Sequence, residues 1–216
     1  LLSIKKNLES SRLVDEKITK GYQQEFRNIS LELSSNLSFK EWYQVYKKII
    51  YWELELSKSD DSSIDEIISM QKSEANSQFF RFVSRNYEDW INNIESPLLS
   101  HNLLEKKVFH LLNNSSPVYL LLIDNLRYDQ WKVIEDNILQ KFKIIDDSMY
   151  MSILPTATQY SRNSIFSGLR PSEIQNLYPK KWLNDEDEGG KNMFEEDFLK
   201  DQIKRLHLEH DKSSYT

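Results

Sequence analysis

Two stretches of sequence decide the fold of the second half of the chain. They read PVYLLLIDNLRYDQW at residues 117–131 and ILPTATQYSRNSIFSGLRP at residues 153–171. The first contains an unbroken apolar run, residues 118–123, which ends at Asp124. A run this short and this apolar is typical of a strand that is buried on both faces of a parallel sheet.

The residues after Asp124 predict a helix and then a second strand. Apolar side chains recur with helical spacing over residues 127–140, and KIIDDSMY at residues 143–150 is a candidate strand. Strand, helix and strand in this order form a βαβ unit, which predicts an α/β fold. Ligand-binding groups of such a unit lie at the carboxyl ends of its strands. We therefore expect Asp124 to lie near residues 156–158, which follow the second strand.

Residues 1–96 have a different character, because all five prolines of the chain lie from Pro97 onward. Apolar and aromatic residues recur there every three to four positions, as in amphipathic helices. Their stripes consist of Tyr22, Phe26, Ile29 and Leu33, followed by Trp42, Val45, Tyr46, Ile49 and Trp52. Successive helices of this kind predict a bundle with an aromatic core. We therefore predict an all-α bundle over residues 1–116 and an α/β domain over residues 117–216.

The composition excludes several classes of protein. None of the 216 residues is cysteine, which rules out disulfides and thiolate metal sites and fits a reducing compartment. The net charge of -6 argues against a protein that grips nucleic acid over a broad surface. No apolar run approaches the length of a membrane span. We expect a cytoplasmic protein without a membrane partner.

Asp124 is the first candidate functional residue. An aspartate at the end of a buried strand can bind a metal ion through its carboxylate oxygens. The same residue could instead cap the following helix, with Arg127 and Asp129 as solvated charges of the first turn. Phosphatases with an aspartyl nucleophile need a second aspartate two positions on, and Leu126 stands there. That class is therefore excluded, while both interpretations of Asp124 stay open.

Thr158 is the second candidate. A threonine hydroxyl is a weak nucleophile and needs activation by a metal or a base. At the start of a helix, the free amides and the dipole favour an alkoxide and a phosphoryl group on it. Thr156 and Gln159 have the spacing of a capping box, so Thr156 could cap the helix while Thr158 faces a site. Gly168 suits the end of the short helix over residues 161–167.

Together the two candidates resemble the alkaline phosphatase superfamily, most closely its PglZ-type branch. In the related nucleotide pyrophosphatases and phosphodiesterases, an Asp-Gly-Phe-Arg-x-Asp segment supplies a metal ligand. A Pro-Thr-x-Thr segment supplies the nucleophile and is followed by a Gly-Leu-x-Pro turn. This chain has DNLRYD at residues 124–129, PTAT at residues 155–158 and GLRP at residues 168–171. The spacing from Thr158 to Gly168 agrees without a gap.

A narrower resemblance covers nearly the whole chain. WELEL at residues 52–56, NLRYDQW at residues 125–131 and LPTATQYSRN at residues 154–163 are similar to PorX-type response regulators, which are linked to type IX secretion. These regulators consist of a receiver domain, a three-helix bundle and a PglZ-type phosphatase-like domain. The resemblance implies that this chain lacks the receiver and most of the catalytic domain, and we expect it to be inactive alone.

For the site, the resemblance implies that Asp124 binds zinc and that Thr158 is both the nucleophile and a metal contact. It implies hydrolysis of nucleotide or oligonucleotide-type phosphodiesters through a covalent phosphothreonine. The implied partners are a sensor histidine kinase acting on a receiver domain outside this chain, a sigma factor and a second copy in a homodimer. Asn125 stands in the usual place of a glycine, Ser161 stands in that of an asparagine, and the other zinc ligands of the superfamily have no matching segments here.

A second class of function stays open. The bundle could transmit phosphorylation of a receiver domain to dimerisation, and the phosphatase-like part could serve as a non-catalytic docking surface. The long aromatic bundle and the acidic charge balance support this alternative.

Overall fold

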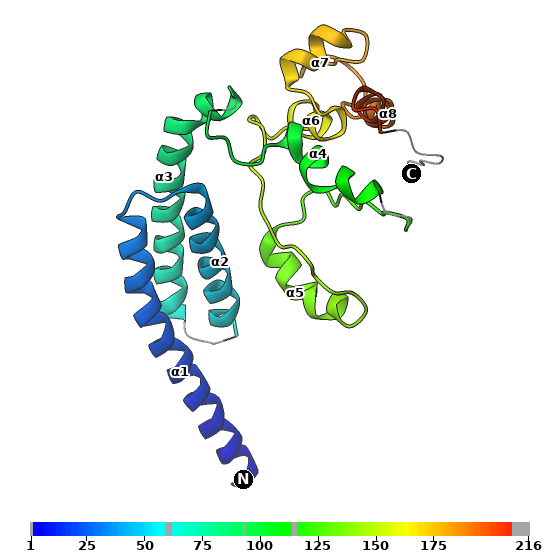
Figure 1. Cartoon of the computed structure of the whole chain (residues 1–216). Coiled ribbons are helices and arrows are strands. Elements are labelled where there is room, and N and C mark those ends of the chain that lie inside the picture. Colours follow the sequence, from blue (N-terminus) through cyan, green and yellow to red (C-terminus); the bar gives the residue numbers. More distant parts are fainter. Residues whose placement is uncertain (1, 59–61, 93, 114–115, 209–216) are drawn as a thin grey trace. The chain divides into compact units, whose positions relative to one another are not determined.

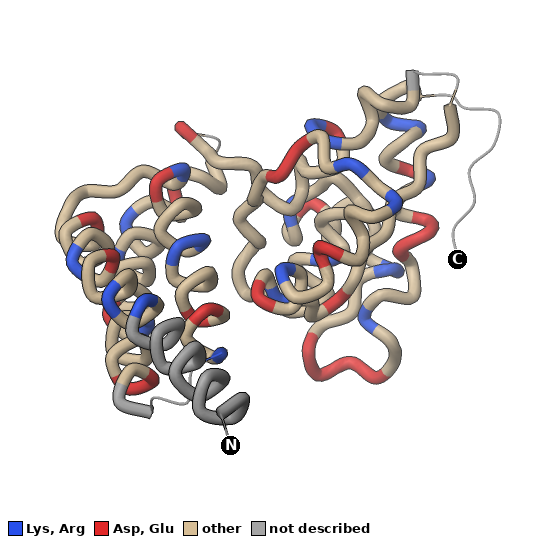
Figure 2. Tube along the Cα trace, turned by 90° about the horizontal axis from the view of Figure 1, so that it is seen from below, with Lys and Arg blue, Asp and Glu red and all other residues tan. Residues whose placement is uncertain are grey.

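The computed structural model describes residues 2–58, 62–92, 94–113 and 116–208 (Figure 1). It divides into two compact units that do not follow the chain in a simple order. Unit 1 comprises residues 1–94 and 124–146, and unit 2 comprises residues 95–123 and 147–216. Figure 2 shows acidic and basic residues interspersed along the helices of each unit. Within the described residues, no helix is both long enough and apolar enough to cross a membrane.

Unit 1 is built on an up-and-down bundle of three helices, which confirms the predicted helical first part (Figure 1). The three are α1 (Leu2–Leu33), α2 (Phe39–Leu56) and α3 (Ser62–Ile91). A further helix, α5 (Tyr128–Leu139), contacts α2 and confirms the helix predicted over residues 127–140. The start of α2 is fixed by a capping box, in which the Ser38 N–H donates to the Glu41 carboxylate at 2.8 Å.

The core of the bundle is aromatic, as the stripes predict. The Trp42 ring lies 5.3 Å from the ring of Phe79 and 6.0 Å from that of Phe82, and all three belong to an apolar cluster that contains buried Ile29 and Val45. Burying one such side chain contributes about 1.5–3 kcal/mol, so this layer supplies much of the stability of the bundle. Trp42, Phe79 and Phe82 are thereby accounted for as packing, whereas Tyr51 and Phe80 are exposed.

A polar group inside the bundle fixes the alignment of α1 with α3. Gln71 is buried, and its amide accepts a hydrogen bond from the Tyr22 hydroxyl at 3.2 Å and donates one to the Phe26 carbonyl at 3.1 Å. A one-residue slip would leave these buried groups unpaired, which costs about 1–3 kcal/mol per group. Burial raises the pKa of Tyr22 to about 12.

Unit 2 packs short helices around two small apolar clusters. Its helices are α4 (Leu103–Lys107), α6 (Asn163–Ser167), α7 (Pro171–Leu177) and α8 (Glu195–Arg205), with 3-10 turns at Ser100–Asn102 and Phe109–Asn113. In one cluster α6, α7 and α8 contribute Phe166, Ile174 and Phe198, all of which are buried. The α6–α8 packing determines where the segment around Thr158 lies within the unit.

The predicted strands do not form in the described residues. Residues 118–123 and 143–150 are irregular, and Tyr119, Leu121 and Ile145 are 81%, 79% and 94% exposed. A segment becomes a strand by forming a ladder with a neighbour, and no described residue of these two stretches belongs to a strand. An isolated parallel bridge between Leu99 and Met151 is the nearest approach to a sheet in the described part of the chain. The structure therefore corrects the predicted βαβ unit, whose helix forms without its strands, and the α/β class is not confirmed.

Candidate functional site

Asp124 begins a tight turn that leads into α5. Its Oδ1 accepts a hydrogen bond from the Asn125 N–H at 2.9 Å, and its side chain is exposed. The residue at the N-cap of α5 is Arg127, so the capping interpretation of Asp124 is wrong. Asn125 has a φ of 56°, in the left-handed region that glycine and, less often, asparagine adopt. Asparagine is thus compatible with the left-handed backbone of this turn.

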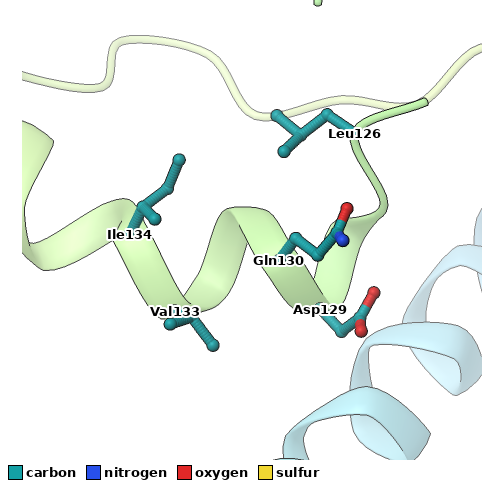
Figure 3. A pocket seen from close by; sticks show the side chains of 5 residues that line it. All are labelled: Leu126, Asp129, Gln130, Val133 and Ile134. Carbon is teal, nitrogen blue, oxygen red and sulfur yellow. The ribbon is translucent and has the colours of Figure 1, made fainter. Parts of the chain in front are cut away.

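The two first-turn charges, Arg127 and Asp129, form an ion pair in which the Arg127 side chain is 67% exposed. Nη2 of Arg127 lies 2.7 Å from Oδ2 of Asp129, and its Nε lies 3.0 Å from Oδ1. The hydrogen bond from the Arg127 guanidinium holds the pKa of Asp129 below its usual value. A pocket of about 360 Å³ lies beside this pair and is lined by Leu126, Asp129, Gln130, Val133 and Ile134 (Figure 3). Because Asp129 is its one ionisable lining residue and is engaged with Arg127, the pocket offers no free catalytic group.

The bundle helix α2 contacts the start of α5. The ring of Tyr46 lies 5.8 Å from that of Tyr128, the first residue of α5. The Lys47 ammonium lies 4.5 Å from the ring centre of Tyr43 and 5.9 Å from that of Tyr128. Burial, and then the negative charge of Asp129, raises the pKa of Tyr46. The turn that begins at Asp124 is therefore connected to the bundle through aromatic and cation–π contacts.

Thr158 is the first residue of a π-helical turn, Thr158–Arg162, that continues into α6. Its carbonyl accepts the hydrogen bond from the Asn163 N–H that closes the turn. The N-cap residue is Ala157, and Thr156 is exposed, so the predicted capping by Thr156 is wrong. The predicted position of Thr158 in the first turn is confirmed. π-Helical turns are rare and occur frequently at functional sites.

Gly168 ends α6 as predicted. Its φ of 64° lies in the left-handed region, and its N–H donates to the Ser164 carbonyl at 3.0 Å. A Cβ at this position would lie 2.2 Å from Nε2 of Gln202, a buried residue of α8. Glycine is therefore required twice, by the backbone conformation and by the close approach of α8.

Ser161, which stands where the nucleotide pyrophosphatases have asparagine, is buried in the same turn. Its hydroxyl donates to the Ala157 carbonyl at 3.3 Å. The next residue, Arg162, forms an ion pair with Glu195 at the start of α8. This pair could not be predicted from the sequence, because its members lie 33 positions apart and no motif joins them.

The family of the chain follows from its second half. Residues 103–212, more than half of the chain, match the family model described as the BREX system PglZ alkaline phosphatase-like domain. The chain belongs to the PglZ alkaline phosphatase-like family. Residues 12–91 match the model of the PorX response regulator linker domain. The two matches support a PorX-type regulator with a PglZ domain, as the sequence motifs predict, and no curated protein matches the chain.

The PglZ match contains both candidate residues, which the structure assigns to different units. Asp124 belongs to unit 1 and Thr158 to unit 2, so their predicted convergence stays a prediction. An alkaline phosphatase-like family suggests a metal-dependent enzyme. Across the described ranges, no three His, Cys, Asp or Glu side chains gather in a group that could hold a metal ion. Zinc sites use four ligands, so the described residues of this PglZ domain do not complete one by themselves.

Proposed function

We propose that this PorX-type regulator is a zinc-dependent phosphodiesterase or phosphatase that acts on nucleotide compounds, with Thr158 as its nucleophile. The observation that supports the proposal is the position of Thr158 at the start of a helical segment inside the PglZ match. The positive end of a helix dipole favours the negative charge that develops on a nucleophilic oxygen and on a phosphoryl group.

The proposed reaction has two steps at phosphorus. Oγ1 of Thr158 attacks the phosphorus atom, a bond between the two forms, and the bond from phosphorus to the leaving oxygen breaks. The hydroxyl proton of Thr158 passes to solvent, and the departing alkoxide takes up a proton. Water then attacks the same phosphorus and releases Oγ1, which regenerates the threonine. The start of the turn carries partial positive charge, which stabilises the anionic transition states.

The cofactor and the partners belong to the same proposal. Zinc would be held by Asp124, Thr158 and further ligands from outside the described residues. A sensor histidine kinase would phosphorylate a receiver domain outside this chain, and a sigma factor and a second copy of the protein would be further partners. We also propose that the protein acts in the cytoplasm in the regulation of type IX secretion, and that the bundle and the PglZ domain divide near residue 116.

The nucleophile is tested with the intact protein loaded with zinc and the phosphodiester bis(p-nitrophenyl) phosphate. We expect Thr158→Val to lower kcat at least about a thousand-fold, as the loss of a nucleophile does in other hydrolases. Thr156→Val is the matched control, since Thr156 is exposed two residues away and caps nothing, and we expect its kcat to stay within about twofold of wild type. Equal rates for wild type and Thr158→Val would remove Thr158 from the reaction.

A second function, a non-catalytic regulatory and docking module, is favoured by one observation. The bundle helix α2 contacts α5 through Tyr46 and Tyr128, so a rearrangement of the bundle would reach the turn at Asp124. In this alternative the intact protein hydrolyses no phosphodiester above the rate of Thr158→Val, and phosphorylation of the receiver domain changes its oligomeric state. Size-exclusion chromatography with light scattering measures that change directly.

A further inference from the structure

A buried ion pair ties the turn that carries Thr158 to α8. Nε of Arg162 donates to Oε1 of Glu195, and Nη2 of Arg162 donates to Oε2 of Glu195 at 3.0 Å. The Glu195 side chain is 1% exposed and that of Arg162 is 22% exposed. Two parallel hydrogen bonds between a planar guanidinium and a carboxylate fix orientation as well as distance.

We propose that the Arg162–Glu195 pair positions Thr158 for attack on phosphorus. This inference rests on the proposed function, because it assumes that Thr158 is the nucleophile. Arg162 and Glu195 are positioning residues here and are not assigned any contact with substrate.

The Glu195 end of the pair is a fixed point in unit 2. Glu195 is the first residue of α8, where the helix dipole stabilises its negative charge. The helix itself is anchored by Phe198 and Gln202, which are 0% and 2% exposed. A carboxylate on such a helix cannot follow a displaced partner without disturbing the core.

The Arg162 end controls the geometry of the turn. Thr158 and Arg162 are the first and last residues of the π-helical turn, and the Asn163 N–H bonded to the Thr158 carbonyl closes it. The side-chain amide of Asn163 donates to the Lys191 carbonyl at 2.9 Å, so the same end of the turn has a second attachment near α8. A wide turn of this kind is a local departure from the α-helix. Of the two contacts that join this end of the turn to the α8 region, the one made by Arg162 is charged and bidentate.

The pair is better explained by geometry than by stability. Replacing a buried ion pair with apolar residues is often neutral or stabilising, so its presence is weak evidence of a role in stability alone. Misplacing a reacting group by about 1 Å can lower a rate about a hundred-fold. A rigid, directional contact four residues from a nucleophile is therefore of direct use to catalysis.

The first test measures the turn without reference to activity. Glu195→Gln keeps the size of the side chain and removes its charge, and Glu196→Gln makes the same change at the next residue, which is exposed and pairs with Lys200 at 2.6 Å. In the intact protein, we expect hydrogen exchange of the Asn163 amide to be at least about tenfold faster in Glu195→Gln than in Glu196→Gln. Equal exchange in the two variants overturns the proposal.

The second test separates positioning from folding by steady-state kinetics with bis(p-nitrophenyl) phosphate. We expect Glu195→Gln to lower kcat about 10-fold to 100-fold with KM unchanged within about twofold, and Glu196→Gln to leave both at wild-type values. Arg162→Lys keeps the positive charge but loses the bidentate guanidinium. We expect this variant to fold even if Glu195→Gln does not, with a kcat between those of wild type and Glu195→Gln. An unchanged kcat in Glu195→Gln or in Arg162→Lys overturns the proposal.

A failure of this inference is distinguishable from a failure of the proposed function. If Thr158→Val retains the wild-type rate, the nucleophile assignment is wrong, and with it the role of the pair in positioning that nucleophile. If Thr158→Val is inactive and Glu195→Gln is fully active, the nucleophile stands and the pair has no part in placing it.

Discussion

Replacement of Gly168 by alanine should destabilise the segment around Thr158 by an amount that the structure sets. Alanine at a φ of 64° costs about 1 kcal/mol for the left-handed backbone alone. Its Cβ would also lie 2.2 Å from Nε2 and 2.6 Å from Cδ of buried Gln202, which has to move. Overpacking of this kind costs about 1–3 kcal/mol, so we expect a loss of about 3 kcal/mol in total.

Native-state hydrogen exchange of the α6 amides measures this loss locally. About 3 kcal/mol corresponds to exchange roughly a hundred-fold faster in Gly168→Ala than in wild type. Gly190→Ala is the matched control. The nearest atom to its Cβ is Cγ of Met193 at 3.1 Å, and this exposed side chain can shift. We therefore expect the local stability measured by exchange to change by less than about 1 kcal/mol. Wild-type exchange rates in Gly168→Ala would contradict the close contact between α8 and Gly168.

Three further predictions concern unit 1. Trp42→Ala should lower the free energy of unfolding of the bundle by about 3–5 kcal/mol, measured by urea denaturation and circular dichroism, and a loss below about 1 kcal/mol would contradict the buried contacts of this ring. Burial raises the pKa of Tyr22 from 10.0 to about 12, so its contribution to stability is complete below pH 10 and is lost as the pH rises through 12. Between pH 9 and pH 11 the free energy of unfolding of wild type should therefore fall by about 1.4 kcal/mol more than that of Tyr22→Phe. At either pH the variant lacks the hydrogen bond to Gln71, which contributes about 1 kcal/mol. Identical pH profiles would count against the burial of this hydroxyl. Tyr46→Ala should accelerate hydrogen exchange in α5 through the loss of the Tyr128 contact while the exchange of α1 stays as in wild type, and equal acceleration in α1 would show that Tyr46 serves the bundle as a whole.

The helices of the first half are predictable because their information is local. The spacing of Trp42 and Ile49 defines the buried stripe of α2, and Ser38 with Glu41 defines its start, all within a few turns of chain. Helix formation needs no distant partner for its backbone hydrogen bonds. The same reasoning identifies α5 and the end of α6 at Gly168, where one glycine satisfies a left-handed conformation.

The strands are a different case, because their hydrogen bonds depend on other segments. Residues 118–123 have the composition of a buried strand, yet Tyr119 and Leu121 are largely exposed and no ladder forms there. The apolar pattern indicates that a segment can form a strand if a neighbouring strand is present. It does not indicate whether such a neighbour exists. The backbone conformation of Asn125 is also invisible in the sequence. Its positive φ explains why asparagine is suited to this position, and only the structure reveals that φ.

The candidate site divides along the same line. Motif spacing indicates Asp124 and Thr158, because short segments with fixed spacing carry the family signal. The pairing of Arg162 with Glu195 is invisible in sequence, since it depends on how α8 packs against α6. In the sequence, Glu195 is indistinguishable from any acidic residue in the first turn of a helix. It does occupy that position in α8.

The most direct test of the account is the capture of the covalent intermediate. The intact, zinc-loaded protein is mixed with bis(p-nitrophenyl) phosphate, quenched in acid and analysed by peptide mass spectrometry. We predict a p-nitrophenyl phosphoryl group on the hydroxyl oxygen of Thr158, absent from Thr158→Val and present in Thr156→Val. Turnover at the wild-type rate by Thr158→Val, or an adduct on Thr156 in place of Thr158, would contradict the central claim.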